Sequence, residues 1–197
     1  MKLDLICVDF QGDFINPDGL NFNKGSSVSF IKDTLFPFMK KNNLKACEII
    51  SDYRLPRGKS GNESCVPGTK GYSSGLPSNL RKGYQWVKCM HNPTWIRQEQ
   101  DGAPKQPTQK PEAFDNWLSE NIETKTVVLF GLTAECCLLN VAQELYFRGY
   151  EVYCVYEATD PMNERIGNKE NIMFYSSVAL YMKTINFEGF KRMVGND

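Results

Sequence analysis

Apolar residues in the centre of the chain alternate between short continuous runs and a helical repeat. Residues 126–130 (TVVLF) form a continuous apolar run, which is typical of a strand that is buried on both faces. Between residues 138 and 146, apolar side chains recur at steps of three and four, which predicts a helix that ends before Gly149. Because a second apolar run follows at 150–156, this part of the chain is predicted to be a β-α-β unit with parallel strands.

The rest of the chain repeats this alternation. Further strands are predicted at 3–8, 46–51, 84–88 and 181–185, and helices at 29–41, 113–121, 169–180 and 187–194. Two polar stretches that contain proline, 53–83 and 98–111, are predicted to be loops. Strands that alternate with helices predict one α/β domain over residues 1–197, with three layers and helices on both faces of a mostly parallel six-stranded sheet.

Composition narrows the function classes. The chain has 197 residues, with 23 Lys plus Arg and 23 Asp plus Glu, so no bulk charge favours nucleic acid or a membrane surface. No apolar run is long enough to span a membrane, and the N-terminus lacks a cleavage pattern, so we expect a cytoplasmic protein that acts on a small molecule. The seven cysteines are an odd number, which favours reduced thiols.

Three residues with reactive side chains stand at or after the ends of predicted strands: Asp9, Lys88 and Cys137. The ends of parallel strands share one edge of the sheet, so these side chains could converge there. Cys137 is at the start of a predicted helix, whose dipole would lower the pKa of the thiol. A carboxylate can accept the thiol proton, and an ammonium can stabilise developing charge, which together suit acyl transfer through a thioester. Each residue also has an ordinary explanation, as a turn aspartate, a solvated lysine or a core cysteine.

Several segments, in order, resemble the isochorismatase-like cysteine hydrolases, the family that includes nicotinamidases and N-carbamoylsarcosine amidases. The similar segments are VDFQGDF at 8–14, VPGTKG at 66–71, VK at 87–88, GLTAECCL at 131–138, GYEV at 149–152 and EA at 157–158. The resemblance implies Asp9 as the base, Lys88 as its partner and Cys137 as the nucleophile. Cys136 competes for the nucleophile role, and the position in the motif favours Cys137.

The resemblance has further implications for the site. It implies a cis peptide bond between Leu132 and Thr133, with the backbone N–H groups of Thr133 and Cys137 forming an oxyanion hole. It also implies self-association into a homo-oligomer, a dimer or a tetramer. Aromatic residues near the strand ends are candidates to bind a small planar substrate, and we assign Phe14 and Trp95 to it. Core packing is the alternative for each of these aromatic residues.

One stretch departs from the family. Metal-dependent nicotinamidases carry the motif D-x-H-x-x-x-H, but here Asp52 is followed by Arg54 and by no histidine up to Ser60. A guanidinium does not coordinate Zn²⁺, so we predict no metal and no cofactor. Arg54, Arg57 and Lys70 are candidates to attract an anionic substrate, with a solvated loop as the alternative reading of these charges.

The sequence therefore favours a metal-free cysteine hydrolase that cleaves a small amide, ureide or related C–N bond. A non-catalytic binding protein that keeps the fold is the first alternative, and an isochorismatase-type vinyl ether hydrolase is the second. A redox role for Cys136 and Cys137 is disfavoured because adjacent cysteines form strained disulfides. The sequence does not identify the substrate, since the pattern is weakest in the loops at 53–83 and 90–111.

Overall fold

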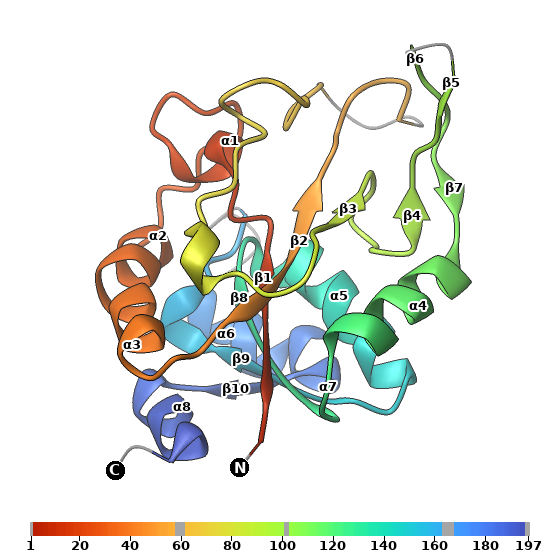
Figure 1. Cartoon of the computed structure of the whole chain (residues 1–197). Helices are drawn as coiled ribbons and strands as arrows, with labels where there is room; N and C mark the ends of the chain where they lie inside the picture. Colours follow the sequence, from red (N-terminus) through yellow and green to blue (C-terminus); the bar gives the residue numbers. More distant parts are fainter. Residues whose placement is uncertain (1, 58–61, 101–102, 163–167, 196–197) are drawn as a thin grey trace.

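Parallel strands form the central sheet of this computed structural model, which describes residues 2–57, 62–100, 103–162 and 168–195 (Figure 1). Within those residues the six strands have the order β10-β9-β8-β1-β2-β3, and every neighbouring pair is parallel. Their bounds are β1 Asp4–Val8, β2 Ala46–Ser51, β3 Trp86–Lys88, β8 Thr126–Gly131, β9 Glu151–Val155 and β10 Lys183–Ile185. All six strands lie within two residues of their predicted positions, so the predicted mostly parallel sheet is confirmed.

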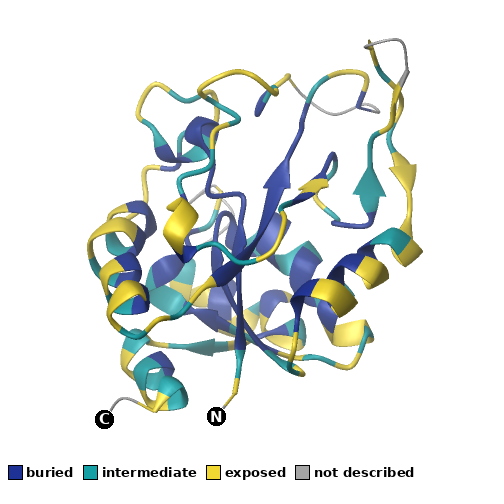
Figure 2. Ribbon diagram, viewed as in Figure 1, coloured by how far each residue is buried: buried dark blue, intermediate teal, exposed yellow. Residues whose placement is uncertain are grey.

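Helices cover both faces of this sheet because side chains alternate along the strands. Ile6 and Val8 of β1 pack in one core cluster, and Leu5 and Cys7 pack in the other. The first cluster includes residues of α4 (Pro111–Asn121), α5 (Leu139–Phe147), α6 (Lys169–Tyr175) and α7 (Val178–Tyr181), and the second those of α2 (Ser27–Phe30), α3 (Phe36–Lys41) and α8 (Phe187–Val194). Figure 2 shows the sheet as the buried middle layer, which confirms the predicted three-layer class.

Two predicted helices are modified by local chemistry. Between α2 and α3 the chain continues as a π-helical segment, Ile31–Leu35, and Pro37 lies in the first turn of α3. Proline has no N–H to donate, so the regular i to i−4 hydrogen-bond pattern is interrupted in this continuous helical stretch. The helix predicted at 169–180 is divided into α6 and α7 at Ser176, whose hydroxyl donates to the carbonyl of Ile172 and accepts from the N–H of Val178.

The stretch 98–111 was predicted to be a loop, and this prediction is wrong in part. It pairs Glu99–Gln100 (β5) with Ala103–Pro104 (β6), and the preceding Trp95–Ile96 (β4) pairs with Thr108–Gln109 (β7). Ladders of two residues are too short to produce an alternating pattern in the sequence. Three single turns complete the described structure: α1 (Gly12–Ile15) and two 3₁₀ turns, Ser78–Leu80 and Tyr156–Ala158.

The connection order places a crevice beside β1. The chain first adds β2 and β3 on one side of β1, and then crosses to add β8 on the other side. Ligands of open α/β sheets bind where the strand order reverses in this way, outside the carboxyl ends of the strands. No helix in the part of the chain that the structure describes is both long and apolar enough to cross a membrane.

Candidate active site

The end of β1 and the end of β8 run side by side up to the edge of the sheet. The N–H of Leu132 donates to the carbonyl oxygen of Val8 over 2.9 Å. Gly131, which precedes Leu132, has φ 121°. A Cβ on Gly131 would lie 2.0 Å from the carbonyl oxygen of Val8, so only glycine allows the ends of β1 and β8 to lie this close together. Asp9 follows directly with φ 50° and is 1% exposed. The glycine therefore brings Asp9 next to the turn that carries Cys137.

Two other polar residues of the segment 8–14 hold the surrounding chain in place. The side-chain amide of Gln11 donates to the carbonyl oxygens of Ser51 and Tyr72, and its oxygen accepts from the N–H of Ser51. The carboxylate of Asp13 accepts from the N–H groups of Leu20 and Cys65. These contacts fix the end of β2 and the loop that follows it against the end of β1.

Lys88, at the end of β3, is fully buried and lies at the centre of the polar contacts. Its Nζ is 2.7 Å from Asp9 Oδ2, 2.7 Å from Ser51 Oγ, 2.9 Å from the Tyr53 hydroxyl and 3.4 Å from Cys137 Sγ. Burial is the largest single influence and would lower the pKa of Lys88, but the interactions with Asp9, Cys137 and Tyr53 together outweigh it, so this pKa is well above its ordinary value. The lysine is therefore an ammonium that faces both the carboxylate and the thiol.

Cys137 lies in the π-helical segment Ala134–Leu138 that begins after β8, and it is 5% exposed. Burial and, to a smaller extent, the charge of Asp9 raise the pKa of its thiol, Lys88 lowers it in part, and the net pKa is about 12. The expectation that the helix start lowers this pKa is therefore wrong. Desolvation of the thiolate and the nearby Asp9 carboxylate set a pKa far above neutral pH, so the thiol is protonated there.

Three further polar residues belong to this cluster, although the sequence did not place them in it. Ser51 Oγ donates to Asp9 Oδ1 over 2.8 Å, and the Tyr53 hydroxyl lies 3.4 Å from Cys137 Sγ. The exposed His91 places Nδ1 3.5 Å from the same sulfur and 3.4 Å from the Tyr53 hydroxyl. Ser51 and Tyr53 stand at the end of β2, which could have indicated them by the same reasoning that found Lys88. His91 follows an irregular turn, so no periodic pattern placed it.

A cavity of about 400 Å³ opens beside Cys137, which is within the size range of small-molecule sites. It is lined by Phe14, Asn21, Phe22, Asn23, Tyr53, Arg57, Asn62, Ser64, His91, Leu132, Thr133, Cys136, Cys137 and Met162. Phe14, assigned above to the substrate, is among these residues. Trp95, the other residue assigned to it, is not among them. Trp95 lies half-buried on β4, where its carbonyl oxygen accepts from the N–H of Cys89.

The oxyanion-hole candidates both line this cavity. The peptide bond between Leu132 and Thr133 is cis, as the sequence resemblance implied. Thr133 precedes the segment Ala134–Leu138, and its carbonyl oxygen accepts from the N–H of Leu138. The turn is held from outside by Asp160, whose carbonyl oxygen accepts from the N–H of Ala134. The backbone next to Cys137 is therefore fixed at both of its ends.

The segment that starts at Asp52, compared above with a metal-binding motif, forms ion pairs through Arg54. Arg54 places Nη2 2.6 Å from Asp52 Oδ2 and 2.7 Å from Glu99 Oε1. The Arg54 guanidinium thus occupies the Asp52 carboxylate, which a metal ion would need as a ligand. These residues therefore do not fit a metal ion. Within the described residues, no three His, Cys, Asp or Glu side chains gather in a group that could hold a metal. Residues 58–60, the last of that stretch, lie outside the described part.

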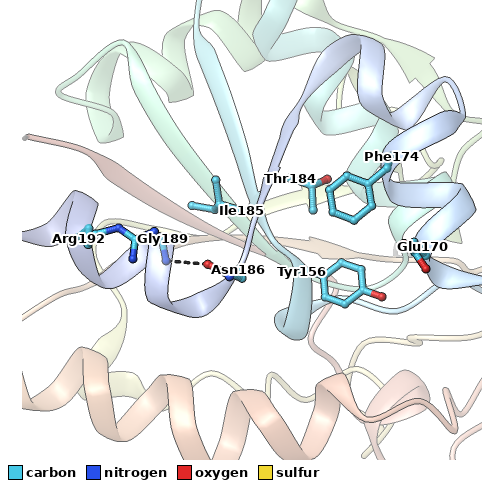
Figure 3. Close-up of a pocket in the computed structure, with 8 residues that line it drawn as sticks. All are labelled: Tyr156, Glu170, Phe174, Thr184, Ile185, Asn186, Gly189 and Arg192. Atoms are coloured by element: carbon cyan, nitrogen blue, oxygen red, sulfur yellow. Dashed lines mark hydrogen bonds between the residues drawn. The ribbon is translucent and has the colours of Figure 1, made fainter.

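A second cavity, of about 620 Å³, lies far from the cluster along the sheet, at β10 (Figure 3). Its lining includes Glu170 and Phe174 of α6, Thr184 of β10 and Arg192 of α8 (Figure 3). Cys137 lines the first cavity and is absent from the described lining of this one, so the cluster that the sequence indicated lies beside the first cavity.

Comparisons with known proteins bear on the fold. No protein-family model matches the chain, and a search of curated proteins finds no match. Among solved structures, an isochorismatase-like hydrolase from Alkaliphilus metalliredigens has a TM-score of 0.70 at 17% identity over 98% of this chain and 99% of its own. An N-carbamoylsarcosine amidase from Thermoplasma acidophilum has 0.63 at 18% identity, over 94% and 96%. A nicotinamidase/pyrazinamidase from Bacillus subtilis has 0.61 at 18% identity, over 93% and 100%.

These matches extend over nearly the whole length of both chains, and their identities establish similarity of fold. The chain therefore has the fold of the isochorismatase-like hydrolases, as its sequence segments predicted.

Proposed function

We propose that the chain is a cysteine hydrolase of small amides, ureides or related C–N bonds, with Cys137 as nucleophile and Asp9 and Lys88 as its partners. One observation carries this proposal: the buried Asp9–Lys88 ion pair lies against the Cys137 sulfur at the wall of a cavity. A buried ion pair is a costly feature for stability alone, and perturbed titratable groups gather at functional sites. Amidases with the same fold support the choice of the C–N bond.

The raised pKa of Cys137 determines how the reaction begins. Because the thiol is protonated at rest, its proton passes to the Asp9 carboxylate as the sulfur attacks the carbonyl carbon. The oxygen of the tetrahedral intermediate becomes negative and is stabilised by the backbone N–H groups of Thr133 and Cys137. The Lys88 ammonium holds Asp9 in place and stabilises charge on the sulfur.

Asp9 then returns the proton to the nitrogen of the leaving group. The C–N bond breaks, the amine leaves and a thioester remains on Cys137. Water attacks this thioester and gives one proton to Asp9, which passes it back to the sulfur as the carboxylic acid departs. The cycle therefore consumes one water and restores the protonated thiol.

Acyl-enzyme trapping tests the proposal directly. The protein is incubated with a panel of small amides and ureides, ammonia release is followed, and the reaction is quenched in acid for mass spectrometry of the peptide with both cysteines. We expect release with a subset of the panel and an acyl group on Cys137. Cys137→Ala abolishes both signals, and the matched variant Cys136→Ala retains them. Equal loss in the two variants, or turnover that survives Cys137→Ala, contradicts the assignment.

A further inference from the structure

Three cationic residues were candidates to attract an anionic substrate, Arg54, Arg57 and Lys70, and they lie in different surroundings. Arg54 is held between Asp52 and Glu99 and does not line the cavity beside Cys137. Lys70 lies exposed in a turn. Arg57 alone of the three is among the residues that line the cavity, and it is only 7% exposed.

The other cavity walls are compatible with a negative charge. Among the described residues that line it, none is Asp or Glu, and besides Arg57 and the two thiols the polar side chains are three asparagines, Ser64, Thr133, Tyr53 and His91. Phe14, Phe22 and Met162 supply apolar surface. A buried guanidinium in such surroundings interacts with an anion more strongly than it would in water, and its planar donors match the two oxygens of a carboxylate.

Tyr53 relates Arg57 to the reacting sulfur. The Arg57 guanidinium carbon lies over the Tyr53 ring, 4.0 Å from its centroid, and the hydroxyl of the same side chain is 3.4 Å from Cys137 Sγ. The cation and the nucleophile thus both contact the same tyrosine side chain, and both line the cavity. A short molecule along this side chain places one end at the guanidinium and the other at the sulfur.

We propose that the cavity selects small amides and ureides that carry a carboxylate, which Arg57 binds while the scissile carbonyl lies at Cys137. The amide part of this inference rests on the function proposed above, whereas the anion preference rests on the cavity itself. Arg57 is then the residue that determines specificity.

A pair of alkylating probes measures the preference without any turnover. Iodoacetate and iodoacetamide have the same shape and leaving group and differ in one negative charge. Their rates of reaction with Cys137 are compared at one mildly alkaline pH, by mass spectrometry, in the full chain with Cys136→Ala. We expect Arg57→Gln to lower the iodoacetate-to-iodoacetamide ratio by about tenfold, as loss of a charge-assisted hydrogen bond would. The matched control Lys70→Gln, which removes the same charge outside the cavity, keeps the ratio.

Two features keep this test decisive. The iodoacetamide rate in Arg57→Gln reports whether the cavity is intact, because that probe is neutral. Arg57→Lys keeps the charge without the planar donors, so it is expected to retain part of the preference. The proposal is overturned if Arg57→Gln leaves the ratio unchanged, or if the Gln and Lys variants give the same ratio.

A matched pair of substrates separates this inference from the proposed function. Succinamate and butyramide have similar length, and a carboxylate in the first replaces a methyl group in the second. We expect kcat/KM for succinamate to exceed that for butyramide by at least about tenfold, and Arg57→Gln to remove the difference. Equal hydrolysis of the two overturns the anion preference and leaves the hydrolase intact. No hydrolysis of either one or of any member of the panel above, with the charge-dependent alkylation preserved, overturns the hydrolase and supports the anion cavity.

Discussion

Strand β1 has a carboxylate at each end, and each carboxylate is paired with a lysine. At its first residue, Asp4 is 2.5 Å from Lys82 and also accepts from the N–H groups of Glu123 and Thr124. Just beyond its last residue, Asp9 is 2.7 Å from Lys88. The two pairs use the same residue types on the same strand, but their surroundings differ.

The two ion pairs differ in their exposure to water and in the groups that contact them. Lys82 is 24% exposed, and the remaining Asp4 contacts are backbone N–H groups, so this pair ties strand ends together. Lys88 is fully buried and also contacts a thiol and a tyrosine hydroxyl beside a cavity. The same residue types thus form a partly solvated pair at one end of a parallel strand and a fully buried cluster with a thiol at the carboxyl end, the end at which parallel sheets bind ligands.

The largest expected effect is on activity, at the two aspartates. Asp9→Asn removes the proposed proton acceptor for Cys137, so we expect kcat to fall by on the order of 10²–10⁴-fold. Asp4→Asn keeps kcat near the wild-type value because Asp4 lies at the opposite end of β1. Ammonia release from the best amide of the panel measures both. Similar losses in the two variants would show that the loss comes from folding and not from the proton acceptor.

The next effect is on stability, at the two lysines. Lys88→Met leaves the Asp9 carboxylate buried without its ammonium, which we expect to lower the free energy of unfolding by about 3–5 kcal/mol. Lys82→Met acts on a partly solvated pair whose carboxylate keeps two backbone donors, so we expect a loss of about 1 kcal/mol. Urea denaturation followed by circular dichroism compares the two variants. A larger loss of unfolding free energy in Lys82→Met than in Lys88→Met would contradict this comparison of the two ion pairs.

A pH-dependent effect follows from the buried thiol. The pKa of Cys137 is about 12 in the folded chain against an ordinary 9.0, because burial disfavours the thiolate. Since the folded pKa is raised, burial of the neutral thiol stabilises the fold below pH 9 and this contribution is lost as pH rises toward 12. We therefore expect iodoacetamide to modify Cys137 far more slowly in the native chain than in urea at pH 9. Equal native and unfolded rates would indicate a thiolate at rest.

The smallest expected effect concerns the second group that contacts the sulfur. His91 Nδ1 lies 3.5 Å from Cys137 Sγ, so it competes with Asp9 for the role of proton acceptor. If Asp9 is the base, His91→Gln lowers kcat by less than about tenfold, since only a contact at the cavity is lost. The pH profile of kcat/KM provides the check. A loss as large as that of Asp9→Asn, together with a changed pH profile, would transfer the role to His91.

Much of the architecture could be predicted from the sequence because it depends on local periodicity. The run at 126–130, the helical repeat at 138–146 and the stop at Gly149 were each read from spacing alone, and β8, α5 and the left-handed Gly149 confirm them. The short ladders within 95–109 were missed because two-residue strands leave no period.

The candidate site was predictable only as far as strand ends and motif positions allow. Asp9, Lys88 and Cys137 all follow or end strands, and the structure brings them together. Ser51 and Tyr53 share that property and were missed as members of the cluster, while His91 enters it from an irregular turn. Trp95 was assigned to the substrate for its residue type and its place near a strand end, and it lies away from the lining of the cavity.

The sequence by itself determined the order of the elements, the parallel sheet and the identity of the residues that the sheet brings to its carboxyl edge. Those features follow from periodicity and from the geometry of parallel strands, which act over a few residues. Only the tertiary structure decided the protonation of Cys137, the division of roles among Arg54, Arg57 and Lys70, and the contact of His91 with the sulfur. Burial and charge pairing depend on neighbours distant in the chain, and desolvation of the thiolate and the nearby Asp9 carboxylate set a thiol pKa far above neutral pH.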